Sequence, residues 1–194
     1  MKHTLVLGFA AAALMLGVIP ASATPGTGIA SAPIVARGTT TETFVIGTPQ
    51  TVTVTRTVKI RIKGKTYTRR VKVQVETVKR LATCGPAPTS CDTAFQQVTI
   101  NPSGSTGWHT HPRATFVAIA QGEGTLYNAG GTGCTGEKYG ANSGFFQTEA
   151  DNHVLRNEGA TPLVLYAFYL LPTGTPSTSI RTDQPQPANC PTIP

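Results

Sequence analysis

Three histidines have the side-chain type and the spacing of metal ligands. His109 and His111 are separated by one residue within the run Trp108-His-Thr-His-Pro, and His153 follows much later in the chain. Side chains alternate between the two faces of a β-strand, so His109 and His111 would point to the same face. A third histidine from a distant strand would then close a three-nitrogen metal site inside a barrel.

Three neutral imidazoles suit a divalent transition metal, and Fe, Mn, Zn, Cu and Ni all accept such ligands. Three protein ligands leave coordination positions open for water or a small molecule, as a catalytic metal site requires. The sequence indicates no general base. The alternative interpretation is a polar cavity without metal, in which the histidines hydrogen-bond to one another, to Thr115 or to Tyr127.

The elements that would position these histidines are short strands separated by turn residues. Strands are predicted at residues 95–100, 109–111, 115–120, 125–128, 145–148, 153–157 and 163–171. Frequent Gly and Pro between such strands favour an all-β sandwich or barrel. No later part of the chain has a convincing helical period, so the fold class predicted here is all-β.

Two short motifs resemble those of the cupin superfamily. His109, His111 and Gly122 match the first motif, and His153 with Asn157 matches the second. The sequence departs from the family pattern at Ser103, Thr115, Thr148 and Ala150. The resemblance covers roughly residues 95–194, is strongest to secreted bacterial single-domain cupins, and implies a jelly-roll barrel.

The resemblance also implies a function. Its metal ligands would be His109, His111 and His153, and an enzyme of this type would be a metal-dependent dioxygenase or isomerase acting on a small molecule. Cupins usually place a glutamate ligand where this chain has Thr115, whose neutral hydroxyl is a poor donor to metal. Glu149, shortly before His153, is the candidate for a substitute ligand. Cupins often pair through exposed strands, so the resemblance implies a homodimer.

Residues 1–23 are predicted to be a secretory signal peptide. Lys2 precedes an apolar run of about 16 residues, and Ala21-Ser-Ala23 ends it with the small residues of a cleavage site. The alternative, an uncleaved membrane anchor, is disfavoured because a spanning helix needs roughly 20 apolar residues. No later segment is long and apolar enough to span a membrane. We therefore expect a secreted, periplasmic or cell-envelope protein, with a flexible leader at residues 24–38.

Export would place the four cysteines in an oxidising compartment, where disulfides form. Cys84 and Cys91 lie close together in a Pro-rich loop, which favours pairing them and leaves Cys134 to tether Cys190 in the C-terminal tail. Four cysteines allow three pairings, and the sequence alone does not select one. A thiolate metal site is disfavoured because the chain has no Cys-x-x-Cys motif.

Residues 39–80 are predicted to be a β-hairpin extension, and residues 81–194 the barrel domain with its tethered tail. Apolar β-branched residues alternate with Thr, Lys and Arg along the first strand. Gly64-Lys65 fits a two-residue turn, which places Val58 opposite Val71 and gathers the apolar side chains on one face.

The hairpin holds most of the positive charge of the chain. Ten of the 16 Lys and Arg residues lie between Arg56 and Arg80, where Glu76 is the only acidic residue. The basic surface predicted from this run comprises Arg56, Lys59, Arg61, Lys63, Lys65, Arg69, Arg70 and Lys72. Either these cations protect a strand edge from aggregation, or they bind anionic cell-envelope polymers or lipid headgroups. Nucleic acid is disfavoured because the protein is expected to be exported and Tyr67 is the only stacking aromatic of the segment. The alternative function is therefore a non-catalytic small-ligand or metal-binding module that docks to the envelope through its hairpin.

Overall fold

The computed structural model describes residues 23–85, 89–130, 134–149, 151–190 and 192. The predicted signal peptide lies outside these residues except for Ala23. The strands are β1 (Thr27–Ser31), β2 (Ile34–Thr40), β3 (Phe44–Ile62), β4 (Lys65–Cys84), β5 (Cys91–Ser105), β6 (His109–Thr110), β7 (Thr115–Gln121), β8 (Glu123–Asn128), β9 (Glu137–Gly140), β10 (Gly144–Gln147), β11 (His153–Arg156), β12 (Leu163–Pro172) and β13 (Thr182–Asp183). A short 3-10 helix, η1, spans Ser177–Ser179.

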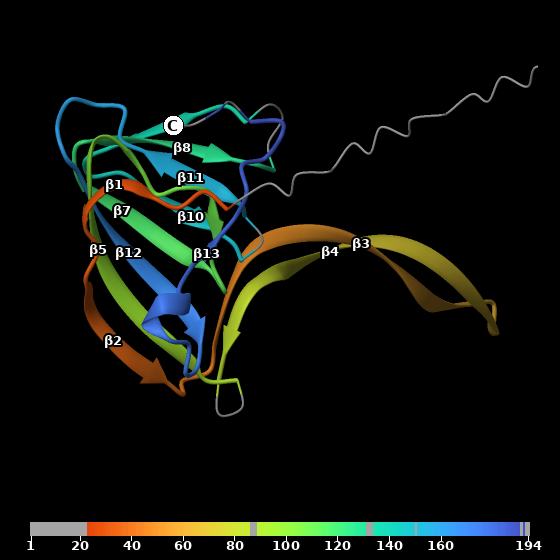
Figure 1. Ribbon diagram of the computed structural model, residues 1–194. Helices are drawn as coiled ribbons and strands as arrows, with labels where there is room; N and C mark the ends of the chain where they lie inside the picture. The colour runs from red at the N-terminus through yellow and green to blue at the C-terminus, as the bar shows by residue number, and fades with distance from the viewer. Residues whose placement is uncertain (1–22, 86–88, 131–133, 150, 191, 193–194) are drawn as a thin grey trace, which may run out of the picture.

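The barrel is organised around the long strand β5. It pairs antiparallel with β12 along one edge and with β2 and β1 along the other. β7 joins β12 to β10, while β11 is flanked by β8 and β6. The described strands other than β3 and β4 therefore form one nearly closed antiparallel barrel, consistent with a cupin jelly roll (Figure 1).

Alternating side chains fill the interior of the barrel. Along β12, Leu163, Leu165, Ala167, Tyr169 and Leu171 are buried. These residues pack in one cluster with others from β5, β7, β8 and β11. Full burial of an aliphatic side chain is worth about 1.5–3 kcal/mol, so this cluster is the main source of stability.

The N-terminal part of the barrel corrects the sequence analysis. Residues 24–38 were expected to be a flexible leader, and that prediction is wrong because β1 and β2 pair with β5 there. Arg37 makes an ion pair with Asp92 of β5 at 2.6 Å. The edge of β5 that does not face β12 needs hydrogen-bonding partners, and the small residues of this segment allow it to follow that edge. The barrel thus includes residues on both sides of the hairpin in sequence.

The hairpin, called here the arm, consists of β3 and β4, which form a sheet of their own and project away from the barrel (Figure 1). The turn is Lys63-Gly64 and not the predicted Gly64-Lys65, because Ile62 pairs with Lys65. Both turn residues have positive φ, 47° and 76°, as a type I′ hairpin turn requires. The register differs from the predicted one by two residues, so every side chain keeps its predicted face.

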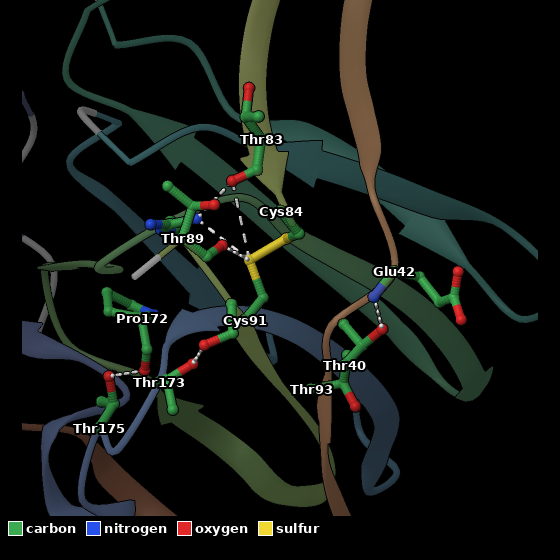
Figure 2. Close-up of a disulfide and its surroundings, with 12 residues drawn as sticks. Thr40, Glu42, Thr83, Cys84, Thr89, Cys91, Thr93, Pro172, Thr173 and Thr175 are labelled. Atoms are coloured by element: carbon green, nitrogen blue, oxygen red, sulfur yellow. Dashed lines mark hydrogen bonds between the residues drawn. A yellow bond between two sulfur atoms is a disulfide. The ribbon is translucent and has the colours of Figure 1, made fainter. Parts of the chain in front are cut away.

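The base of the arm is fastened to the barrel. A disulfide joins Cys84, the last residue of β4, to Cys91, the first residue of β5 (Figure 2). Both cysteines are fully buried and pack with Leu170 of the barrel and Phe44 of the arm. Arg113 donates a hydrogen bond to the Thr83 carbonyl at 3.0 Å.

A second disulfide joins Cys134 to Cys190 and holds the C-terminal segment beside Trp108 and Val154. The two disulfides are the pairing that the cysteine spacing favoured among the three alternatives. Helices long and apolar enough to cross a membrane are absent from the described part of the chain.

Candidate metal centre

The structure brings the three histidines together inside the barrel. His109 of β6 lies directly opposite His153 of β11, and His111 follows β6 by one residue. One ring nitrogen from each residue lies within 4.8 Å of the other two. The three residues are 5%, 7% and 3% exposed in sequence order, so the cluster is shielded from bulk water.

Main-chain carbonyl groups fix the orientation of all three rings. The Nδ1 atom of His109 lies 2.8 Å from the Gly107 carbonyl oxygen. The corresponding distances are 2.9 Å from His111 to the Ile180 carbonyl and 2.8 Å from His153 to the Asp151 carbonyl. A carbonyl oxygen can only accept, so each Nδ1 carries the hydrogen and each Nε2 keeps its lone pair.

The surroundings keep the imidazoles neutral. Burial lowers the pKa of all three histidines, that of His109 well below its usual value and that of His111 to about 3. The positive charge of Arg181 lowers each of these pKa values further. Neutral imidazoles can bind a metal without first losing a proton.

The histidines lie in the wall of a chamber of about 230 Å³. The remaining wall is largely apolar and includes Val98, Val117, Phe145, Leu155, Leu165 and Ala167. Gly26, Ile29 and Ala32, from β1 and its flanks, also line the chamber. The N-terminal strand is therefore part of the site, which the expectation of a flexible leader had missed.

Of the additional ligands considered from the sequence, Thr115 alone reaches the chamber. It is 1% exposed and lies in the chamber wall. Glu149 is exposed and is not among the chamber-lining residues, so the structure does not support it as a fourth ligand. The metal-competent group found among the described residues is therefore the three histidines without a carboxylate.

Tyr127 lies on the outer face of the barrel, contrary to its predicted place in the cavity. Tyr127 pairs with Val154, and the neighbouring pair along the same two strands is Asn128 with His153. Because side chains alternate along a strand, this offset of one residue turns Tyr127 away from the histidines. Its hydroxyl donates instead to Glu158 at 2.9 Å.

Two chamber residues were missed by the sequence analysis. Tyr169 is buried beside His111, with ring centroids 5.2 Å apart, and donates its hydroxyl to Gln96 at 2.8 Å. Burial raises the pKa of this phenol, so it stays protonated. The alternation along residues 163–171 could have placed Tyr169 inside. Arg181 also lines the chamber and donates to Asp183, but nothing in the C-terminal tail signalled its position.

Comparisons with known proteins give a fold likeness only. No family model matches the chain, and no curated protein matches it. A variant of Bacillus subtilis oxalate decarboxylase matches with a TM-score of 0.40 and 19% identity, over 47% of this chain and 23% of that chain. A structure of the same enzyme described by its Mn(II) centres matches with a TM-score of 0.36 and 21% identity, over 40% of this chain and 21% of that one.

An uncharacterised Klebsiella pneumoniae protein with a double-stranded β-helix domain matches with a TM-score of 0.40 and 14% identity, over 48% of this chain and 76% of that chain. The match spans less than a quarter of the oxalate decarboxylase chains. Neither a substrate nor a metal follows for this chain from likeness at this level.

Proposed function

We propose that this protein is an exported member of the cupin superfamily that binds one divalent transition metal through Nε2 of His109, His111 and His153. The observation that carries the proposal is the shared hydrogen-bond pattern of the three rings. Each Nδ1–H is engaged by a main-chain carbonyl, which leaves three Nε2 lone pairs for one ion. Metal-bound histidines commonly donate their other ring N–H in this way, which fixes the tautomer and ring orientation.

The alternative of a metal-free polar cavity accounts less well for this arrangement. In such a cavity the histidines would satisfy one another or a nearby hydroxyl group. Instead, backbone carbonyls hold all three Nδ1 atoms, and the nearby Thr115 hydroxyl donates to the Arg113 carbonyl at 3.5 Å. The three buried neutral imidazoles each have a ring nitrogen within 4.8 Å of the other two. Together they can bind one ion of Fe, Mn, Zn, Cu or Ni.

The chamber favours a small, partly apolar and anionic molecule beside the metal. Its walls are mainly aliphatic, and Arg181 supplies the positive charge. A bound metal would supply Lewis acidity for an isomerisation of such a molecule, or would activate O₂ as the oxidant for its oxidation. Arg181 would orient it, while the apolar wall limits access of water.

Export is supported by the two disulfides, which persist in oxidising compartments. We accordingly place the protein outside the cytoplasm, either secreted or held at the cell envelope. The homodimer implied by the cupin resemblance stays a prediction.

The proposal is tested by the metal content of the chain from Thr24 onward, purified without a histidine tag. We expect about one metal per chain in the unaltered protein, since three ligands from one chain converge on one point. His109→Ala and His153→Ala should each lose most of this metal. Tyr169→Phe is the matched control, because it alters the same chamber without removing a ligand and should keep the metal.

The proposal fails if the folded, unaltered protein contains no metal and takes up none of Fe, Mn, Cu, Ni or Zn. Near-ultraviolet circular dichroism should accompany each measurement, so that loss of metal is separated from loss of fold. The identity of a bound metal would then direct the search for a substrate, and turnover that disappears in His109→Ala would distinguish an enzyme from a binding module.

A further inference from the structure

The arm has one apolar face that is only partly covered by the described residues. Directly opposed residues of two antiparallel strands share a face, and Val52 pairs with Val75, Val54 with Val73 and Ile60 with Tyr67. This face, called here the apolar face, comprises Val52, Val54, Val58, Ile60, Ile62, Tyr67, Val71, Val73 and Val75. Ile60, Ile62 and Tyr67 are 42%, 54% and 51% exposed, although large apolar side chains are usually buried.

The opposite face of the arm is built from threonines and cations. Its members, read from the same register, are Thr51, Thr53, Thr55, Thr57, Lys59, Arg61, Thr66, Thr68, Arg70, Lys72, Gln74 and Glu76. Lys63 and Lys65 add charge at the tip, and all of these cations are exposed. Arg56 and Arg69 interrupt the apolar face, one opposite Val71 and the other opposite Val58. The arm is thus an amphipathic ribbon with cations on its tip and on both faces.

We propose that the arm binds the surface of an anionic lipid bilayer. The apolar face would rest against the boundary between headgroups and acyl chains, while Arg56, Lys65 and Arg69 on that face contact the phosphates. Binding of this kind requires apolar area together with positive charge, and the arm supplies both. Long Lys and Arg side chains can lay their aliphatic stems along an apolar surface and extend their charges to the headgroups, as Arg56 and Arg69 would do.

The ribbon would lie in the plane of the interface and not deeper. Each outer edge of a two-stranded ribbon has backbone N–H and C=O groups without a strand partner, and the bilayer core offers no hydrogen bonds to them. The headgroup layer still holds water for these groups. The face that carries the threonines would then point toward the solvent.

Charge favours this partner over two others. Two copies of the arm stacked through their apolar faces would bring two strongly positive ribbons together and bury Arg56 and Arg69 against each other. A soluble anionic polymer would pair with the cations but would give no role to Ile60, Ile62 and Tyr67. An anionic bilayer satisfies both features of the arm.

The test measures co-sedimentation of the chain from Thr24 onward with vesicles. One set contains equal parts of phosphatidylglycerol and phosphatidylcholine, and the other contains phosphatidylcholine alone. We expect binding to the anionic vesicles only. A variant with Arg56→Gln, Lys65→Gln and Arg69→Gln should partition at least about tenfold less, because each cation near an anionic surface contributes to binding.

The apolar face is tested by Ile60→Thr with Ile62→Thr, which keeps β-branched residues in the strand. This variant should still bind at low salt but should be released several-fold more readily at physiological salt. Lys138→Gln with Tyr166→Thr is the matched control, since both residues are exposed on the barrel, and it should bind as the unaltered chain does. Tyr67→Trp should show a blue shift of its fluorescence with anionic vesicles only.

Three results would overturn the proposal. The first is equal binding to both vesicle sets. The second is binding to a soluble polyanion such as heparin with unchanged vesicle binding in the Ile60→Thr/Ile62→Thr variant, which would assign the arm to a polymer. The third is that the unaltered chain forms a dimer without lipid and the Ile60→Thr/Ile62→Thr variant is a monomer. That result would mean that the apolar face binds a second copy of the chain. None of these outcomes bears on the metal content of the barrel.

Discussion

The barrel and the arm are both built from antiparallel strands, but they use their apolar residues in opposite ways. The barrel closes around its apolar side chains, and Ile100, Leu163 and Leu171 have no exposed surface. The arm has two strands and no second layer, so Ile60 and Ile62 remain about half exposed. An isolated two-stranded hairpin is at best marginally stable in water. Alternation therefore predicts which face of a sheet is apolar, whereas closure of the sheet decides whether that face becomes a core.

The two regions also differ in charge. The arm holds ten of the 16 Lys and Arg residues, while the chamber of the barrel is lined by one, Arg181. A single cation beside three neutral imidazoles suits one small anion, and many cations along an extended ribbon suit a charged surface.

The largest effect should come from removing a barrel side chain. Leu126→Ala should lower the free energy of unfolding by about 2–5 kcal/mol, because the residue is buried in the main core. Ile60→Ala in the arm should lower it by less than about 1 kcal/mol. Urea denaturation followed by the fluorescence of the buried Trp108 compares the two. Similar losses in both variants would mean that the arm belongs to the same cooperative unit as the core.

The seam between β2 and β5 should depend on pH through Asp92. Its carboxylate accepts hydrogen bonds from Arg37 at 2.6 Å, Thr39 at 2.7 Å and the Gly174 amide at 3.0 Å. The hydrogen bond from Arg37 is the main reason why the pKa of Asp92 is lowered. A lowered carboxyl pKa stabilises the fold above the unfolded-state pKa, and this stability is lost as the pH falls through the folded-state pKa.

Asp92→Asn should therefore cost about 1–3 kcal/mol at neutral pH, and the difference should shrink as the pH falls below about 4. Thermal denaturation across that pH range measures it. Glu123→Gln is the control, because Glu123 pairs with Lys138 at the exposed surface and should cost under about 1 kcal/mol. If Asp92→Asn lowers the stability by the same amount at all pH values, the ionised carboxylate of Asp92 is not the source of the lost stability.

Arg181, the cation that lines the chamber, should determine the affinity for anions there without affecting the metal content. Arg181→Gln should keep the metal content and weaken binding of a short carboxylate such as butyrate by about tenfold, as expected for loss of a charged hydrogen bond. Calorimetric titration of the metal-loaded protein measures the affinity. Lys138→Gln removes a cation outside the chamber and should leave the affinity unchanged. Equal affinities of all three proteins would remove Arg181 from the site.

The smallest effect should be confined to the turn of the arm. Lys63 has a φ of 47°, a conformation that asparagine adopts more readily than lysine. Lys63→Asn should stabilise the hairpin locally by up to about 1 kcal/mol, because Asn-Gly is the preferred type I′ turn. Amide hydrogen exchange should slow near the tip of the arm and stay unchanged in the barrel. Lys65→Asn, just outside the turn, should give no such slowing.

The sequence predicted those structural features that depend on local residue patterns. It did not predict features that depend on contacts between residues far apart in the chain. Turn residues between short segments predicted most barrel strands, and the His-x-His spacing with His153 predicted the cluster. The turn was misplaced because two adjacent positions satisfy the glycine preference, and the observed one requires Lys63 in a left-handed conformation. β1 was missed because its residues are small and its order comes from pairing with β5.

The C-terminal segment shows the same limit. Arg181 and the carbonyl of Ile180 reach the site because β13 pairs with β6 and the Cys134–Cys190 disulfide holds the tail against the barrel. These contacts join residues far apart in sequence, and the tail has no periodic pattern that would have revealed them.

The insertion of the arm between β2 and β5 has a consequence for the kinetics of folding. β2 and β5 are neighbours in the barrel, but residues 41–90 separate them along the chain. If the hairpin forms first from its turn, Phe44 and Cys84 meet at its base, and the loop that remains to be closed comprises residues 41–43 and 85–90. A loop that is about fivefold shorter lowers the entropic cost of closure by about 1.5 kcal/mol. The arm, which adds little to the final core, would thus accelerate the step that closes the barrel.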